Sequence, residues 1–150
     1  MDIAGVLKPE RIKLDLQAKT KQEALEELAQ ILMASGALAD KQAFLDDVYE
    51  REKVSSTGIG NGIAIPHGKS EHVKETTVAI GRVAAGLGDW ETFDDVPVTL
   101  VVLLAVDEAD KTGVHVRLLS QMARKLANAD TCKRLTEATA PEQIVEIFSE

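Results

Sequence analysis

The chain has few aromatic residues, four prolines and one cysteine, and each scarcity excludes a class of protein. Aromatic side chains make up only 3% of the 150 residues, so the core must be built from alanine, valine, isoleucine and leucine. Four prolines are too few for a proline-rich linker or a collagen-like chain. The single cysteine, Cys132, excludes an internal disulfide and a site of several thiolates, which fits a cytoplasmic protein.

Long apolar runs and an excess of basic residues are missing as well. No stretch approaches the roughly 18 consecutive apolar residues of a membrane span, and the N-terminus lacks the basic start of a secretory signal. Lys and Arg number 17 against 25 Asp and Glu, which gives a net charge of −8. The missing apolar run predicts no insertion into a membrane. Since an acidic surface repels the phosphate backbone, we also expect no nucleic-acid partner.

The remaining composition is that of an ordinary globular domain. Hydrophobic residues make up 45% of the chain and charged residues 28%, and no internal repeat divides it. A length of 150 residues is typical of one domain that can bury a sizeable core. We therefore expect a single domain that spans residues 1–150.

Hydrophobic periodicity predicts a mixed sheet between layers of helices. Alternating Ile12, Leu14 and Leu16 indicate a short strand, and VTLVVLLAV at 98–106 indicates a strand buried on both faces. Further strands are predicted at 63–65 and 76–85, and helices between 20 and 36, at 41–53, 112–127 and 131–138, and from 141 onward. This order predicts an α/β fold, a three-layer sandwich whose mixed sheet of about five strands is flanked by helices on both faces.

Residues 55–68 read SSTGIGNGIAIPHG, a composition that folding alone does not explain. Glycine at alternate positions is expected where the backbone approaches a ligand closely or adopts a positive φ. The dinucleotide fingerprint G-x-G-x-x-G fails because isoleucine stands where its third glycine belongs. The P-loop also fails, since five residues instead of four separate Gly62 from Gly68-Lys69-Ser70. The segment therefore predicts a site of another kind.

His67 is the residue of this segment with the most distinctive chemistry. It follows Pro66 and precedes Gly68, so its side chain stands on a stiff stem with space behind it. A neutral imidazole is a competent nucleophile near pH 7, since its ordinary pKa is about 6.5, and it suits the capture of a phosphoryl group. From these residues alone, a histidine that merely occupies a turn is an equally good interpretation.

The segment resembles the active-site signature of a known family. Arg51-Glu52 followed by STGIGNGIAIPHG at 56–68 is similar to the EIIA proteins of the bacterial phosphoenolpyruvate-dependent sugar phosphotransferase system, in the fructose/mannitol class. The resemblance continues through VAIGR at 78–82, Asp89-Trp90 and Pro97-Val98 to His115, which opens a helix striped with Leu and Met. It covers essentially the whole chain.

The resemblance implies that His67 accepts a phosphoryl group from the carrier protein HPr and passes it to a cysteine of the cognate EIIB. A phosphoramidate keeps a high transfer potential, so no cofactor is expected, and the histidine spacing offers no metal motif. The resemblance also implies that Arg51 contacts the phosphoryl group and that His115 contacts either that group or His67. Without it, Arg51 is a cation at a helix end and His115 a core-facing histidine beside Leu118 and Met122.

Further residues of the signature are expected to surround the phosphate, and hydroxyls among them suit its oxygens. The set is Ser56, Thr57, Gly58, Gly60, Asn61 and Gly62. The surface around His67 is expected to be shallow and rimmed by apolar residues such as Ile59 and Ile63, because HPr and EIIB must each dock there and leave again.

Two functions of different classes are compatible with this resemblance. The first is a phosphocarrier in sugar uptake, with fructose favoured because AIGR at 79–82 and Asp89-Trp90 resemble fructose-type EIIA. The second is a regulatory protein of the nitrogen-related branch, which binds partner proteins according to its phosphorylation state and which CKRL at 132–135 resembles. A histidine-dependent hydrolase is a weaker third, because the sequence contains no G-x-S-x-G elbow.

Overall fold

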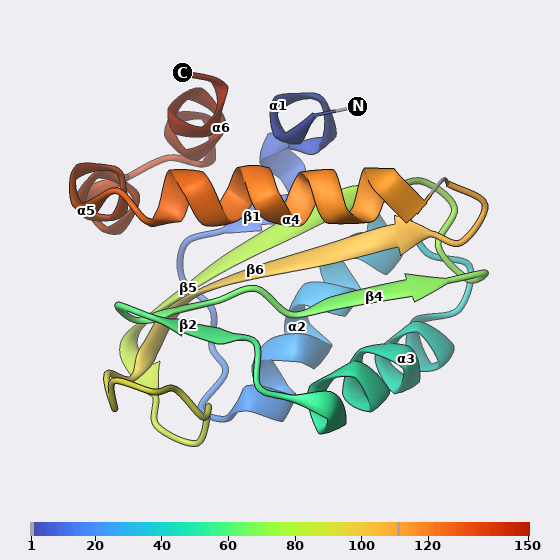
Figure 1. Cartoon of the computed structure of the whole chain (residues 1–150), viewed down its shortest axis with the longest axis horizontal. Coiled ribbons are helices and arrows are strands. Elements are labelled where there is room, and N and C mark those ends of the chain that lie inside the picture. Colours follow the sequence, from blue (N-terminus) through green and yellow to red (C-terminus); the bar gives the residue numbers. More distant parts are fainter. Residues whose placement is uncertain (1, 111) are drawn as a thin grey trace.

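Six strands form one mixed sheet between two layers of helices (Figure 1). The computed structural model describes residues 2–110 and 112–150. The strands are β1 (Ile12–Lys13), β2 (Gly58–Gly60), β3 (Ile63–Ala64), β4 (His67–Ser70), β5 (Thr77–Leu87) and β6 (Val98–Asp107). Their order in the sheet is β1-β5-β6-β3-β2, and β4 pairs with β6 beyond the end of β3. The expected three-layer α/β fold is confirmed, with one strand more than expected.

Two groups of helices cover the two faces of the sheet (Figure 1). One face carries α2 (Lys21–Ala34) and α3 (Lys41–Val54). The other carries α1 (Ile3–Val6), α4 (Thr112–Leu126), α5 (Ala129–Glu137) and α6 (Pro141–Ser149), and a 3₁₀ turn at Pro9–Arg11 leads into β1. All predicted helices are present within two residues of their expected ends, whereas α1 and the 3₁₀ turn were not predicted. None of the described helices combines the length and the apolar character needed to cross a membrane.

Polar residues next to α2 and α3 determine where these helices begin. The Thr20 hydroxyl accepts the Glu23 N–H and the Asp40 carboxylate accepts the Ala43 N–H, so α2 and α3 begin where predicted. The Glu23 carboxylate accepts the N–H of Lys19 instead of Thr20, so the predicted capping box is only half formed. Gly36, with φ +85°, lies just after the end of α2.

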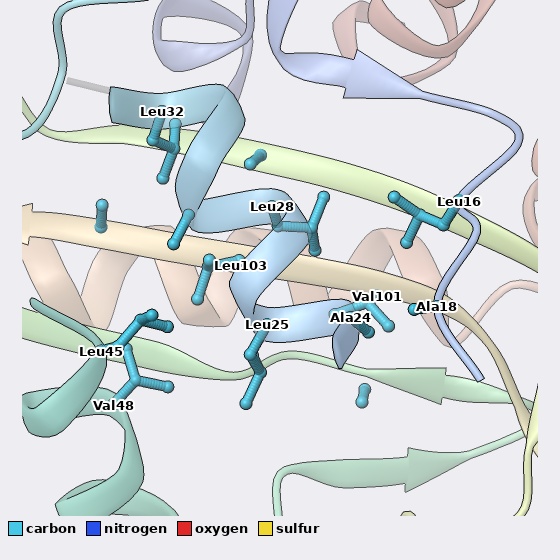
Figure 2. Packing of buried hydrophobic residues seen from close by; sticks show 14 of the residues in the cluster. Leu16, Ala18, Ala24, Leu25, Leu28, Leu32, Leu45, Val48, Val101 and Leu103 are labelled. Atoms are coloured by element: carbon cyan, nitrogen blue, oxygen red, sulfur yellow. The ribbon is translucent and has the colours of Figure 1, made fainter. Parts of the chain in front are cut away.

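Strand β6 is the centre of the sheet and is buried on both faces, as its sequence predicts. Val101, Leu103 and Ala105 belong to the core under α2 and α3, whereas the residues between them belong to the core under α4 and α6. Figure 2 shows Leu25, Leu28 and Leu32 of α2 against Val101 and Leu103, with side chains of α3 beside them. Side chains alternate between the two faces along β6. A residue on a neighbouring strand packs against the same helix layer as the β6 residue with which it pairs.

Strands β3 and β4 lie along β6 in one continuous parallel register, with a break between them. Ile63 pairs with Leu100, and His67 pairs with Leu104. Pro66, which lacks an N–H, stands in the break, and its carbonyl still accepts the Leu104 N–H. The predicted strand at 63–65 is thus confirmed as β3, while β2 and β4 were missed because they are short and glycine-containing.

The register places His67 on the α4 side of the sheet, because paired residues of parallel strands face the same way and Leu104 lies in the core under α4. Gly68 faces the other layer, where an added Cβ would lie 2.9 Å from Val48 Cγ2. Glycine here lets α3 approach the sheet edge closely. The C-terminal end of α3 and the N-terminal end of α4 can therefore both reach the edge strand β4.

Candidate active site

Three predicted residues meet at this sheet edge, one from each layer of the fold. Arg51 lies in the last turn of α3, His67 opens β4, and His115 lies in the first turn of α4. The Arg51 Nε–H donates to His67 Nε2 at 3.0 Å. The rings of His67 and His115 are 5.0 Å apart between centroids and inclined at 62°. The structure thus brings together side chains that are up to 64 positions apart in the chain.

The hydrogen bonds of the His67 ring define which nitrogen carries the proton. Its Nδ1 lies 3.1 Å from the Ile65 carbonyl oxygen, which can only accept, so Nδ1 carries the hydrogen. Nε2 then carries the lone pair, and it accepts the hydrogen bond from the Arg51 Nε–H. The Arg51 Nη1–H donates to the Ser55 carbonyl at 2.9 Å. The nucleophilic nitrogen of a neutral His67 is therefore Nε2.

Burial favours the neutral form of this imidazole. Only 7% of the His67 surface is exposed, and this burial lowers its pKa below the ordinary value of 6.5. The bond to the Ile65 carbonyl acts in the opposite direction, and the positive charge of Arg51 lowers the pKa further. A neutral imidazole next to a guanidinium is suited to attack an electrophile that carries negative charge.

His115 contributes a hydrogen-bonding atom that the described residues leave unused. Its Nε2 is buried and has no hydrogen-bond partner within residues 2–110 and 112–150. Burial lowers the pKa of His115, and the nearby His67, Lys69 and Arg51 lower it further. Leu118 and Met122 on the same helix are fully buried, as the helical stripe predicts. His115 thus closes that apolar stripe and still faces the His67 ring.

The predicted hydroxyl donors make bonds within the protein. Ser56 Oγ–H donates to the Glu91 carbonyl at 2.5 Å, and the buried Thr57 hydroxyl donates to the Glu52 carboxylate. The Asn61 N–H donates to Asp94 Oδ2 at 2.7 Å. These contacts give the three residues structural partners, and a role toward phosphate stays a prediction for them.

The glycines of the signature make room for a distant segment. An added Cβ at Gly58 would lie 2.5 Å from the Glu91 carbonyl oxygen, and one at Gly60, which has φ +89°, would lie 2.8 Å from Phe93 Cζ. The carbonyl of Gly62 accepts the N–H groups of Thr99 and Leu100. Close packing of 91–94 on β2 therefore accounts for Gly58 and Gly60, and their predicted place around phosphate stays a prediction, as does that of Gly62.

One part of the predicted apolar rim is wrong. Ile59 is 36% exposed, whereas Ile63 is only 3% exposed, because its pairing with Leu100 turns its side chain into the core under α4. Exposed apolar side chains next in sequence to the site are Val54, near the end of α3, and Val116, beside His115. Within residues 2–110 and 112–150, no group of three His, Cys, Asp or Glu side chains is arranged to hold a metal ion.

Sequence reasoning missed Glu52 as a residue of the site region. Its side chain is 7% exposed and pairs with Lys21 Nζ at 2.6 Å, and it also accepts the Thr57 hydroxyl. The one available signal was its place beside Arg51 in the family signature, because Lys21 and Thr57 lie on separate segments that only the fold brings together.

The chain is similar in sequence to known proteins along nearly its whole length. The family described as phosphoenolpyruvate-dependent sugar phosphotransferase system, EIIA 2, matches residues 5–150. The fructose-specific EIIA component of Haloferax volcanii is 34% identical over 99% of this chain and 96% of its own. The fructose-specific EIIABC component of Bacillus subtilis is 35% identical over the full chain, which spans only 23% of that longer protein.

Solved structures agree with the sequence relatives. The nitrogen regulatory protein IIA-Ntr of Neisseria meningitidis superposes with a TM-score of 0.88 at 31% identity, covering 97% of this chain and 98% of that one. The IIA mannitol protein of Escherichia coli, in complex with phosphorylated IIB mannitol, gives a TM-score of 0.78 at 25% identity over 95% and 96% of the two chains. The match over 5–150 and these relatives show that the chain belongs to the EIIA 2 family of the phosphoenolpyruvate-dependent sugar phosphotransferase system.

Proposed function

We propose that His67 accepts a phosphoryl group on Nε2 from phosphorylated HPr and passes it to a cysteine of a cognate EIIB, with residues 1–150 acting as one phosphocarrier domain in the cytoplasm. The observation that carries this proposal is the state of the His67 ring. Its Nδ1–H is bound to the Ile65 carbonyl, so Nε2 carries the lone pair, and that lone pair accepts the Arg51 Nε–H at 3.0 Å. Family membership supports a phosphotransferase role of this general kind.

Each half of the transfer is a substitution at phosphorus. The Nε2 lone pair of His67 forms a bond to phosphorus as the N–P bond of the donor phosphohistidine breaks, and its electron pair returns to the donor nitrogen. In the second half, a cysteine thiolate of EIIB attacks the same phosphorus, and the electron pair of the breaking N–P bond returns to His67 Nε2. No bond to Nδ1 changes, so the contact with Ile65 persists throughout.

Arg51 and His115 would stabilise the charge of the group in transit. The Arg51 guanidinium exchanges its bond to the Nε2 lone pair for bonds to phosphoryl oxygens, where charge-assisted contacts are strongest. His115 Nε2, which is buried and unpartnered among the described residues, supplies a further hydrogen bond once the phosphoryl group lies between the rings. Neither residue forms a covalent bond to phosphorus.

Fructose uptake is the favoured biological setting. A relative named as a fructose-specific EIIA component covers 99% of the chain and has nearly the same length. The nitrogen-regulatory alternative is supported by the high structural similarity to IIA-Ntr, with a TM-score of 0.88. The two settings differ in the fate of phosphorylated His67. In the first it transfers its phosphoryl group to an EIIB cysteine, and in the second its phosphorylation changes the binding of regulatory partners.

Phosphorylation by the purified donors tests the acceptor directly. Incubation with phosphoenolpyruvate, enzyme I and HPr is expected to add one acid-labile group of about 80 Da. His67→Ala is expected to gain no mass, because the nucleophile is removed, and His72→Ala, which changes another histidine, is the matched control. Labelling that persists in His67→Ala would refute the assignment. Transfer from the phosphorylated protein to a fructose EIIB then separates the two settings, since the regulatory protein would retain its label.

A further inference from the structure

Glu52 is a buried carboxylate one position from Arg51, and both of its oxygens are engaged. Oε2 pairs with Lys21 Nζ at 2.6 Å, and Oε1 accepts the Thr57 hydroxyl. The Glu52 side chain is 7% exposed and the Lys21 side chain 23%. Removing a carboxylate from water is unfavourable, so a buried pair of this kind is weak evidence of a stabilising role.

A continuous path of hydrogen bonds leads from Glu52 to the His67 ring. The Thr57 carbonyl accepts the Ile65 N–H at 3.0 Å, and the Ile65 carbonyl accepts the His67 Nδ1–H at 3.1 Å. Both backbone groups of Ile65 are therefore engaged, the N–H by Thr57 and the carbonyl by the His67 ring. Thr57 therefore helps to position the carbonyl that, together with the Arg51 N–H donated to Nε2, selects the tautomer of His67.

We infer that Glu52 is a positioning residue for His67. By holding the Thr57 hydroxyl, it steadies the backbone contact between Thr57 and Ile65 and favours the tautomer of His67 that has its proton on Nδ1 and its lone pair on Nε2. Lys21 offsets the buried charge of Glu52 and ties the start of α2 to the same network. Glu52 touches neither the ring nor the transferred group. The effect of Glu52 on the His67 tautomer does not depend on the proposed function. Only its consequence, a faster phosphoryl transfer, rests on that function.

A purely structural role for Glu52 predicts a different outcome. Glu52 joins α3 to Lys21 of α2, so its loss lowers stability whether or not it positions His67. Loss of stability alone leaves the tautomer of the folded protein unchanged. The tautomer is therefore the measurement that separates the two roles, and it is read from the ¹⁵N chemical shifts of the His67 imidazole in the unphosphorylated protein at pH 8.

Thr57→Val is the first variant, because it removes the hydroxyl with little change in shape. We expect the ratio of Nδ1–H to Nε2–H tautomer to fall about five- to tenfold, the effect of weakening one neutral hydrogen bond. Glu52→Ala should give the same shift, and Thr57→Ser, which restores the hydroxyl, should return the wild-type ratio. Glu50→Ala is the matched control, since Glu50 lies on the same helix but its side chain is 70% exposed.

The rate of phosphorylation by HPr is the second readout. It should fall by about the same factor as the Nδ1–H fraction in Thr57→Val and stay at the wild-type value in Glu50→Ala. A wild-type tautomer ratio in folded Thr57→Val overturns the inference, even if Glu52→Ala fails to fold. If wild-type His67 takes up no phosphate at all, the proposed function fails, while the tautomer ratio still decides whether Glu52 positions the ring.

Discussion

Strand β6 and the interrupted pair β3 and β4 lie side by side in one register, yet they contribute different things. β6 is ten residues long, unbroken and paired on both edges. β3 and β4 are separated by Ile65 and Pro66, and β4 has no second neighbour among the described strands. The two regions therefore have different roles. The central strand β6 buries side chains on both faces and so stabilises the fold. At the break between β3 and β4, the Ile65 carbonyl and the His67 ring are available to form the site.

The largest effect should come from the central strand. Leu103 of β6 is fully buried between α2 and the sheet, so Leu103→Ala should lower the free energy of unfolding by about 2–5 kcal/mol. Urea unfolding measures this change. The matched control Met33→Ala, at a position 39% exposed on α2, should lower it by no more than about 0.5 kcal/mol. A similar loss in both variants would mean that burial of Leu103 in β6 gives no special stability.

The next effect concerns the edge and should leave stability nearly unchanged. His115→Ala removes the charge-assisted contact that we propose between His115 and the phosphoryl group. Such a contact is worth about 1.5–3 kcal/mol, so both transfer rates should fall about 10- to 150-fold. Intact-mass measurement of phosphate uptake from HPr and of release to EIIB follows each half. The variant should still accept phosphate slowly, because the nucleophile remains. Wild-type rates in both directions would make His115 a core histidine without a role in transfer.

The smallest effect is on the pH dependence of stability. Burial holds the pKa values of His67 and His115 below 6.5, so the unfolded chain takes up protons first as the pH falls. Their contribution to stability is complete above pH 6.5 and is lost as the pH falls toward the folded pKa values. Urea unfolding at pH 7.5 and 5.5 should show a steeper loss for the wild type than for a His67→Gln, His115→Gln double variant. An equal loss of stability in the two proteins would mean that folding does not lower the pKa values of these two histidines.

The regular elements of this fold were predictable because their signals are local. Helix α2 carries its cap at Thr20 and its apolar stripe within its own sequence, and β6 carries its burial on both faces. Strands β2 and β4 have neither: each is four residues or shorter, contains glycine and exists through its pairing with another strand. The hydrophobic pattern of a short segment contains no information about the strand with which that segment pairs.

The candidate site divides in the same way. Pro66, His67 and Gly68 are informative as a local sequence, and the family signature added Arg51 and His115. The orientation of Ile63 was predicted wrongly because it depends on register with β6, and Glu52 was missed because its partners come from two other segments. The need for glycine at positions 58 and 60 likewise lies in the packing of 91–94, more than 30 residues away in the chain.

The hydrogen bond from His67 to Ile65 also guards the sheet against self-association. A strand edge with free carbonyl and amide groups is a template on which another molecule can pair and aggregate. At Ile65 both groups are occupied, the amide by the Thr57 carbonyl and the carbonyl by the His67 ring. The phosphorylation proposed for Nε2 would leave the Nδ1–H in place, so this point of the edge should stay closed whether or not His67 carries a phosphoryl group.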